Sequence, residues 1–486
     1  MGFLSRFTRV LGSALQPKRA AINKMKPLII IYGSTGTGKS DLAVELATRF
    51  NGEIINADAM QMYKGLPIIT NKLAPEEQRG IPHHLLGSIE LDEDPWVVTQ
   101  FKKEATRIIS EIRDRGKLPI VVGGTAYYLD GLLFEGRLVD DQPALEGGAT
   151  NREELAAKYP ILTDSPEAIL AKLREVDPVM ADKWHPNDGR KIRTSLEIYF
   201  ATGRRASDIY AEQRNKKESK QQAAIETVQS HSLGEILLFW LYAQREVLNE
   251  RLDKRVDKMV QNGLLTETSE VFDYLQRRLT AGGTVDRSKG IWQSIGFRQF
   301  EPYLTALKET PGSPGLSKLK QAGIEDTKSA TRQYAKYQVR WMTMKTILSL
   351  QEEKLLDRLY LLDSSDIQRW NAEVRDRGLE LATKFLADEP LPAPAEVSET
   401  ARDVLAGSVE RSRREDAPCR KICDICNKTL LTEELWQAHI TSRKHSKAVR
   451  GAKKRMLIPA HAAPSRALVA VEPDSSDEMT NSIHPL

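Results

Sequence analysis

Five residues of the segment GSTGTGKS have the types and spacing of a phosphate-binding loop: Gly33, Gly36, Gly38, Lys39 and Ser40. An apolar run precedes them and a helical pattern follows, which is the context that such a loop requires. Glycines let backbone N–H groups point at phosphate oxygens, the helix start adds partial positive charge, and lysine and serine supply a cation and a Mg²⁺ ligand. We therefore predict phosphate binding by Gly33, Ser34, Thr35, Gly36, Thr37, Gly38, Lys39 and Ser40, against the alternative of a chance glycine-rich turn.

This loop does not identify the molecule that carries the phosphates. ATP and GTP are the default ligands, and an NTPase would also need an acid after a later apolar strand to hold Mg²⁺. The run LPIVVGGT ends in glycines and a threonine, whereas GEIINAD ends in Asp58. Because strand ends of such sheets face the ligand crevice, we expect Asp58 beside the phosphates. There it could bind Mg²⁺, cap a helix or act as a base.

A second group of residues has the spacing of a zinc site. Cys423 and Cys426, followed by His439 and His445, match a C₂H₂ finger, in which two thiolates lie on a turn and two histidines follow on a helix. Cys419 is left over and is expected to be free. The basic runs RSRRE and RKHSKAVRGAKKR flank the finger, which favours RNA binding or nuclear import. A finger that contacts protein is the alternative.

Apolar runs alternate with helical patterns around the phosphate-binding loop. Strands are expected at KPLIIIYG, GEIINAD, LPIVVGGT and EILLFWLYA, and helices over residues 40–50, 96–116 and 245–263. Such alternation predicts an α/β fold with a doubly wound parallel sheet. The phosphate-binding loop and Asp58 then lie at the same edge of this sheet.

Composition places the chain among ordinary globular proteins. Its 486 residues allow two or three domains, 40% of them are hydrophobic and 28% are charged. The net charge of +4 does not by itself demand a nucleic acid, and three cysteines exclude a disulfide framework and fit a reducing compartment. The longest apolar run, ILLFWLYA, is far shorter than the roughly 20 residues of a membrane span, so no membrane association is expected.

The order of these patterns predicts the domains. Residues 1–26 are basic, free of acids and apolar at helical spacing, which is typical of a mitochondrial transit peptide; a basic tail is the alternative. The phosphate-binding core with its C-terminal helices is expected over 27–135 and 215–385, interrupted by a helical insertion over 136–214. A Pro/Glu-rich linker over 386–415, the zinc finger over 416–455 and a disordered tail over 456–486 follow.

Seven ordered segments resemble the tRNA dimethylallyltransferase (tRNA isopentenyltransferase) family: GSTGTGKS, INADAMQMYKGLPIITNK, GIPHHLLG, VVGGTAYYLDGLL, HPNDGRKIRTSLEIYFATGR, RLDKRVDKMVQNGLLTE and TRQYAKYQVRWM. The resemblance covers about Pro27 to about Leu350. A finger after a linker is similar to the eukaryotic branch of this family, and the long spacing between the two histidines resembles fingers that bind double-stranded RNA.

The resemblance implies that the loop holds dimethylallyl diphosphate, and that the five-carbon group moves to the N6 amine of the adenine 3′ of a tRNA anticodon. Asp58 corresponds to the family's catalytic aspartate, and Thr35 to a threonine that contacts the diphosphate. Arg255 corresponds to an arginine that stabilises the diphosphate's charge, with Arg251, one turn earlier, as the alternative. Mg²⁺ is expected as the catalytic metal and Zn²⁺ as the structural metal of the finger.

The resemblance also implies contacts with the tRNA anticodon stem-loop. The expected residues are Asp58, Ala59, Met60, Gln61, Thr125, Arg190, Lys191, Ile192, Arg193 and Thr194. Arginine and lysine suit phosphates, and the amide of Gln61 could read a base edge in two directions. Thr125 has a second interpretation, a hydroxyl that caps the start of a helix. The family commonly has serine where this chain has Ala59, so no hydroxyl contact is expected there.

Two further function classes share part of this pattern. A P-loop small-molecule kinase would use the same loop and sheet, but it would explain neither the later segments nor the finger. A nucleotide-gated RNA-binding protein would use the finger as its active part. We expect a monomer that is located in the mitochondrion and cytoplasm, and also in the nucleus.

Overall fold

The structure is a computed structural model that describes residues 26–134, 154–212, 215, 233–287, 289–413, 418–426 and 428–456. The chain divides into two compact units. The first unit contains residues 1–135 and 229–413, and the second contains 136–228 and 414–482. The insertion and the finger, predicted as separate domains, thus belong to one compact unit. The predicted transit peptide up to residue 25 and the predicted tail from residue 457 lie outside the described residues.

The first unit is built on a six-stranded parallel sheet with the order β3-β2-β4-β1-β5-β6. Its strands are β1 (Leu28–Gly33), β2 (Gly52–Asn56), β3 (His83–His84), β4 (Leu118–Val122), β5 (Ile236–Tyr242) and β6 (Leu359–Asp363). The central strands are near-continuous runs of Ile, Leu and Val, because both faces of a parallel sheet are covered by helices. The predicted doubly wound α/β fold is confirmed.

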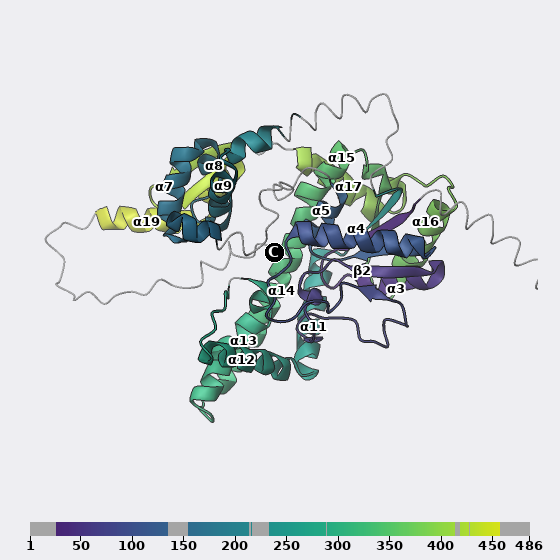
Figure 1. The fold of residues 1–486 in the computed structure, drawn as a ribbon, viewed down its shortest axis with the longest axis horizontal. Coiled ribbons are helices and arrows are strands. Elements are labelled where there is room, and N and C mark those ends of the chain that lie inside the picture. The colour runs from purple at the N-terminus through teal and green to yellow at the C-terminus, as the bar shows by residue number, and fades with distance from the viewer. Residues whose placement is uncertain are drawn as a thin grey trace, which may run out of the picture. The chain divides into compact units, whose positions relative to one another are not determined.

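Helices cover both faces of this sheet (Figure 1). One face packs against α3 (Lys39–Phe50) and α16 (Arg377–Leu386), which lie side by side and share a core with Ile29, Ile31 and Phe239. Among the other helices, α4 (Val98–Asp114) packs on β4 and β2, and α17 (Glu399–Arg413) packs on β6. The alternation of side chains along each strand allows both layers to be apolar.

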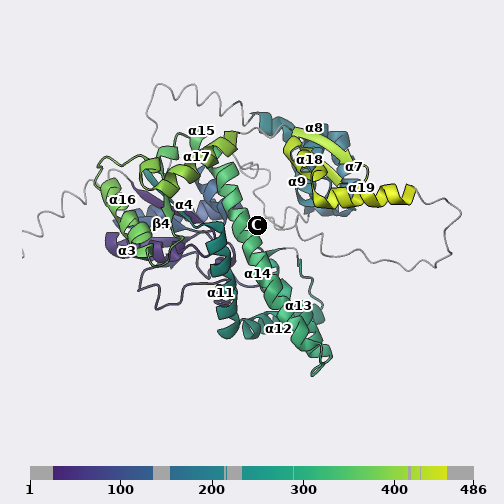
Figure 2. The same ribbon diagram turned by 180° about the vertical axis from the view of Figure 1, so that it is seen from behind.

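A helical arm extends from the sheet. It consists of α11 (Arg245–Gln261), α12 (Leu264–Thr280), α13 (Phe297–Glu309) and α14 (Leu316–Trp341), with α14 running alongside α11 in both views (Figures 1 and 2). A π-helical turn over Met342–Thr346 joins α14 to α15 (Ile347–Glu352). Four-residue repeats of buried side chains, such as Leu248, Leu252 and Val256 on α11, form the contact between these helices.

The carboxylate of Asp130 on α5 (Ala126–Leu133) connects the sheet to α14. It accepts hydrogen bonds from the Tyr32 hydroxyl at 3.0 Å, from the Trp341 indole at 2.7 Å and from the Thr346 hydroxyl at 2.9 Å. Tyr32 lies at the end of β1, directly before the phosphate-binding loop. One acid therefore fixes α14 and the π-helical turn relative to that loop.

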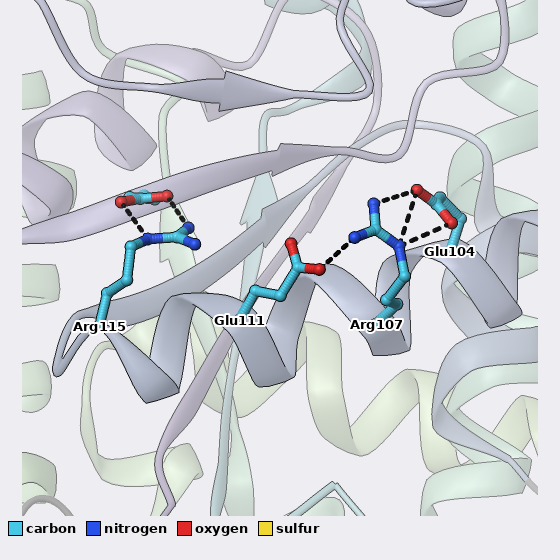
Figure 3. A network of polar contacts seen from close by, with 5 residues as sticks. Glu104, Arg107, Glu111 and Arg115 are labelled. Atoms are coloured by element: carbon cyan, nitrogen blue, oxygen red, sulfur yellow. Dashed lines mark hydrogen bonds and ion pairs between the residues drawn. The ribbon is translucent and has the colours of Figure 1, made fainter.

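The opposite end of β2 is held by a buried ion cluster. Arg115 donates to both oxygens of Glu53, with distances of 3.3 and 2.6 Å, beside a ladder of exposed ion pairs along α4 that joins Arg107 to Glu104 and Glu111 (Figure 3). Burial by itself raises the pKa of Glu53, but hydrogen bonds from Arg115, Lys117 and His84 outweigh it and lower the pKa to about 2. The cluster supports the sheet and lies at the edge away from the site.

The second unit combines helices of the insertion with the finger. The helices include α7 (Pro166–Val176), α8 (Pro178–Lys183) and α9 (Gly189–Thr202), and the finger consists of β7 (Pro418–Cys423), β8 (Lys428–Thr432), α18 (Glu433–Ile440) and α19 (Arg443–Met456). Each of α7, α8 and α9 starts at a side-chain cap, provided by Ser165, Asp177 and Asp188. Leu173, Ile192 and Leu196 lie in the apolar core of this unit.

The predicted linker over 386–415 is wrong for its second half. The Pro-rich part up to Val397 has only one short helical turn, as expected, but α17 follows and packs on β6. Ala401 and Leu405 are buried in that contact, and four-residue spacing places them on one helix face. Its polar composition concealed this apolar stripe. In the described part of the chain, no helix is long and apolar enough to cross a bilayer.

Candidate active site

Predicted site residues meet at the carboxyl ends of three neighbouring strands. The phosphate-binding loop leaves β1, Asp58 follows β2 by two residues, and Gly123, Gly124 and Thr125 follow β4. In a parallel sheet these ends lie at one edge, where such folds bind their ligands. Gly123 allows the close approach: a Cβ there would lie 2.2 Å from the carbonyl oxygen of Ala57.

The loop adopts a conformation that requires glycine at two positions. Gly36 and Gly38 both have φ of +83°, which other residues rarely adopt. A side chain at Gly38 would also meet the indole nitrogen of Trp370, 2.8 Å from the position of its Cβ. The Thr37 hydroxyl donates to the carbonyl of Ser34 at 2.9 Å and closes the turn. Backbone N–H groups at the start of α3 are thereby presented as an anion cradle.

Lys39 is a desolvated cation inside this cradle. Its Nζ donates to the carbonyl oxygen of Ser34 at 2.7 Å. Burial lowers the pKa of Lys39 to about 8, with Asp58 opposing and Arg255 adding to the decrease. A charge that is expensive to bury gains most from an anionic ligand.

The carboxylate of Asp58 faces these cations. The Asp58 backbone N–H donates to the Asn56 side chain at 3.1 Å, and Oδ1 accepts from the Met60 N–H at 3.1 Å. Burial raises the pKa of Asp58, while Lys39, the Met60 and Gln61 N–H groups and Arg255 act in the opposite direction. The side chain is half-buried, so a ligand can reach it. The arrangement is that of an ionisable acid with increased proton affinity.

The two arginines proposed for the diphosphate have different surroundings. The two terminal nitrogens of Arg251 are engaged: they donate to the carbonyls of Gly36 at 3.1 Å, Ser364 at 2.8 Å and Ser365 at 3.1 Å, and only its Nε lacks a partner. Arg255 has no hydrogen bond or ion pair among the described residues, and its Nε is buried without a partner. Burial lowers the pKa of Arg255, and Asp58 raises it. Arg251 is thus a clamp on the loop, and Arg255 is the guanidinium available for an anion.

Thr125 does not cap a helix with its hydroxyl. It occupies the position before α5 but makes no side-chain cap, and its Oγ1 accepts the N–H of Ala59 at 3.0 Å. The alternative interpretation of this residue is therefore wrong, because its hydroxyl oxygen accepts from the segment after β2 and not from the helix. Thr125 and Ala59 are both buried, and they hold the Asp58 segment against the β4 end.

Only one of the two polar groups of the Gln61 side chain is available to a base. Its side-chain NH₂ donates to the carbonyls of Thr70 at 3.2 Å and Asn71 at 3.1 Å. The amide oxygen alone is left for a base, so pairing in two directions is excluded. Met60, the preceding residue, is half-buried.

Two residues of α14 that the sequence reasoning missed complete the site. The Gln338 side chain accepts the N–H of Thr35 at 2.8 Å and donates to the carbonyl of Gly124 at 2.9 Å. Tyr334, one turn earlier, lies within hydrogen-bonding reach of Thr125 and Gln338, and burial followed by Asp58 raises its pKa. Gln338 therefore joins the phosphate-binding loop to the β4 end. Spacing of four residues in TRQYAKYQ placed both on one helix face, and this was the only signal in the sequence.

The second predicted group lies on α9 in the other unit. Arg190, Lys191 and Arg193 are exposed, and Lys191 pairs with Asp188 at 2.7 Å. Ile192 is fully buried in the apolar core of its unit, so its side chain packs inward while the predicted contact of this segment with tRNA stays a prediction. Alternating exposure is what a helix with one buried face requires. The basic residues of this segment still present a surface suited to phosphates.

The four residues predicted to bind zinc converge. Ligand atoms of Cys423, Cys426, His439 and His445 all lie within 4.8 Å of one another. His445 Nδ1 is 3.6 Å from the Cys423 sulfur and 3.5 Å from the Cys426 sulfur, and the Nε2 of His439 is buried without a hydrogen-bond partner. Two thiolates and two imidazoles around one point fit tetrahedral Zn²⁺. The side chain of Cys419 lies outside the described residues.

Comparisons with known proteins match both regions of the chain. Residues 61–345 match the model of the IPP transferase family, and residues 420–446 match a model described as a double-stranded RNA-binding zinc finger. A tRNA dimethylallyltransferase of Schizosaccharomyces pombe is 37% identical, over 89% of this chain and 96% of its own length. The human tRNA dimethylallyltransferase is 33% identical, over 96% of this chain and 94% of its own.

A solved structure has the same fold. It is a eukaryotic dimethylallyltransferase acting on tRNA, 33% identical, with a TM-score of 0.70. The match covers 88% of this chain and 98% of that one. The sequence matches and the structural match therefore identify the same family, and each covers nearly the full length of the matched protein.

Proposed function

The chain belongs to the IPP transferase family as a tRNA dimethylallyltransferase with a C₂H₂ zinc finger, and from this premise we propose how its residues act. The enzyme transfers a dimethylallyl group from dimethylallyl diphosphate to the N6 amine of the adenine 3′ of a tRNA anticodon, and diphosphate leaves. One observation carries the residue assignment. Asp58, Lys39 and the unpartnered Arg255 interact electrostatically at the mouth of the phosphate-binding loop.

Asp58 is the general base. An adenine amine is a weak nucleophile, because its lone pair is delocalised into the ring, and it must lose a proton as it attacks the allylic carbon. Burial raises the pKa of Asp58, which suits this step, and the cations beside it act in the opposite direction by favouring the ionised carboxylate. Its half-buried position leaves one side open to the base.

Lys39 and Arg255 stabilise the leaving diphosphate. Negative charge accumulates on its oxygens as the C–O bond breaks, and preorganised donors in a desolvated site lower the barrier most. Arg255 brings a guanidinium that needs no rearrangement of protein hydrogen bonds, and N–H groups of the loop add further donors. The Thr35 N–H donates to Gln338, so this N–H maintains the shape of the loop and does not bind the diphosphate directly.

A magnesium ion is compatible with this site. When bound, Mg²⁺ neutralises part of the charge on the diphosphate. Ser40 is the loop residue that would hold it, because the Ser40 hydroxyl is half-buried and makes no hydrogen bond within the described residues. The remaining ligands would be phosphate oxygens and water, as Mg²⁺ prefers.

The tRNA is read by both units. The amide oxygen of Gln61 is free to accept from a base edge near Asp58, and Arg190, Lys191 and Arg193 face the RNA backbone from α9. Because Asp58 lies at a strand end inside the core, the target adenine must leave its stack to reach it, as in other enzymes that act on a base.

The experiment is a transfer assay. The protein is incubated with Mg²⁺, labelled dimethylallyl diphosphate and an anticodon stem-loop RNA with consecutive adenines. We expect label on the RNA and one diphosphate released for each group transferred. A matched RNA carries purine, which lacks the exocyclic amine, at the target position, and should bind without becoming labelled.

Parallel reactions with labelled ATP separate the remaining function classes. A kinase would transfer or hydrolyse the γ-phosphate, and a nucleotide-gated RNA-binding protein would bind RNA without transferring label from either compound. Either result, with no prenyl group on the RNA, contradicts the proposal.

A further inference from the structure

The finger is bonded to the insertion at two points. Arg420 on β7 donates from Nη1 to the carbonyl of Ala181 at 3.2 Å and to the carboxylate of Asp182 at 3.0 Å. His185 contacts the carbonyl of Thr429 on β8 through Nε2 at 3.0 Å. β7 is therefore bonded to the last turn of α8, and β8 to the segment that joins α8 to α9. Figure 2 shows α8, α9, α18 and α19 of this unit. We name Arg420, Asp182, His185 and Thr429 the finger lock.

The direction of the histidine hydrogen bond follows from its second contact. The N–H of Asn187 donates to Nδ1 of His185 at 3.1 Å, so Nδ1 carries no proton. Nε2 therefore carries the proton and donates to the carbonyl of Thr429. Arg420 likewise satisfies a carbonyl in the last turn of α8, where intrahelical donors are missing and a cation is favoured. Each contact pairs one donor with one fitting acceptor.

The lock links the zinc ligands to the RNA-facing helix. Arg420 precedes Cys423 by three residues, and Thr429 follows Cys426 by three residues, so the zinc site fixes the hairpin that carries both. On the other side, His185 lies three residues before Asp188, which caps α9. The finger lock thus connects the hairpin that carries two zinc ligands to the segment that starts α9.

Exposed basic side chains lie on both α9 and α19. Arg190, Lys191 and Arg193 are exposed on α9, and Arg443, Lys444, Lys447 and Arg450 are exposed on α19. On α19 the residues 443, 447 and 450 share one face, because they are four and three positions apart. Two separate basic surfaces are present in one compact unit.

We propose that Arg420 and His185 are positioning residues that lock the zinc finger onto the insertion, so that α9 and α19 engage one tRNA as a single body. The proposal rests on the proposed function, which supplies the tRNA. Without the lock, the finger is no longer bonded to the insertion through Arg420 and His185, and α19 is held less firmly relative to α9. The second contact is then made at a lower effective concentration, and affinity falls without the loss of any RNA contact.

The test measures tRNA affinity and turnover with the full-length enzyme. In Arg420→Ala/His185→Ala we expect the Kd for tRNA to rise roughly tenfold, with kcat at saturating tRNA unchanged. His185→Gln, which keeps an N–H donor, should lose less affinity than His185→Ala. Lys428→Ala removes a positive charge from the same hairpin outside the lock, and should change Kd by no more than about threefold.

A second readout separates a lock from a direct RNA contact. Backbone hydrogen exchange without RNA should increase in β7, β8 and α8 of the double variant and stay unchanged in Lys428→Ala. Zinc chelation should weaken tRNA binding by wild-type enzyme, but add little in the double variant, because the same coupling has already been lost. Zinc content of each variant is measured to show that the finger is still formed.

Three results overturn the proposal. Unchanged exchange in the RNA-free double variant, together with weaker binding, means that Arg420 or His185 contacts RNA directly. Unchanged Kd means that the lock is irrelevant to tRNA binding, and fully additive effects of chelation mean that zinc acts by another route. Absence of prenyl transfer by wild-type enzyme would contradict the proposed function instead. The hydrogen-exchange comparison, which is made without RNA, would still test whether Arg420 and His185 hold the finger.

Discussion

The catalytic edge of the sheet and the basic surfaces of the second unit use charge in opposite ways. At the sheet, three desolvated groups, Asp58, Lys39 and Arg255, interact with one another, and burial shifts the pKa of each. In the second unit, seven arginine and lysine side chains on α9 and α19 are exposed to solvent. Desolvated charges act strongly on charge that develops within a few ångströms, whereas exposed charges act weakly and additively on a polyanion. Chemistry and affinity are therefore divided between the two regions.

The largest effect is expected from Asp58→Asn. The amide cannot accept the proton of the adenine amine, so single-turnover prenyl transfer should fall by about 10³-fold. Affinity for tRNA and for the donor should stay within about threefold of wild type, since the amide preserves shape and the acceptor oxygen for the Met60 N–H. Turnover close to wild type would remove Asp58 as the base.

The paired variants Arg255→Ala and Arg251→Ala should separate chemistry from structure. Loss of Arg255 removes a donor to the leaving diphosphate and should reduce kcat by about 10²-fold with little change in thermal unfolding. Loss of Arg251 leaves three carbonyls without their donor and should lower the free energy of unfolding by about 1–3 kcal/mol. The reverse pattern would exchange the roles of the two residues.

Gln338→Leu should affect the phosphate-binding loop and the β4 end together. It leaves the Thr35 N–H and the Gly124 carbonyl without partners, at a cost of about 1–3 kcal/mol in unfolding free energy. We expect a higher KM for the donor and an unchanged Kd for tRNA. Gln321→Leu, on the same helix but exposed, is the control. Equal behaviour of the two variants would show that the bridge does not matter.

Diphosphate binding should take up protons at alkaline pH. Burial lowers the pKa of free Lys39 to about 8, and a bound anion raises it again. Below about pH 7 Lys39 is already protonated and no uptake is expected; as pH rises through 8, uptake appears and pyrophosphate affinity declines. Calorimetry in two buffers of different ionisation enthalpy measures it. Lys39→Arg, which stays charged, should abolish the uptake, and its persistence would assign the proton elsewhere.

The smallest effect is expected from single exposed charges. Lys447→Ala should raise the Kd for tRNA by about two- to threefold and lower the salt dependence by about one ion, with kcat unchanged. Titrations at several salt concentrations measure both. A hundredfold loss from this change would mean that the exposed surface contains a specific contact, and the division between the two regions would fail.

The sequence predicted features that depend on neighbours along the chain. The strands around the phosphate-binding loop, the position of Asp58 after β2 and the zinc ligands all follow from local spacing, and the structure has the same strands and converging ligands. Features that depend on distant partners were missed or wrong. Thr125 serves Ala59 rather than a helix, and Ile192 is buried between two exposed basic residues.

Long-range contacts also decide which of the two arginines, Arg251 or Arg255, is available to bind an anion. Nothing in the spacing of Arg251 and Arg255 distinguishes them, because the carbonyls that occupy Arg251 come from the loop and from the end of β6, up to 215 residues away. Gln338 lies 303 residues from Thr35 in the chain, so its bridge is visible only in the fold. The finger lock has the same origin, with His185 and Thr429 separated by 244 residues.

The π-helical turn over Met342–Thr346 has a consequence for insertions and deletions. Such a turn contains one residue more than an α-helical turn, so it takes up a surplus residue without changing the phase of the helix beyond it. Deleting one residue there would convert the turn to α-helix and keep the stretches on either side in phase, whereas a deletion between Gln338 and Trp341 would rotate these two residues by about 100° relative to each other and break one set of their contacts. The turn is therefore the place in this helix where losing one residue disturbs the site least.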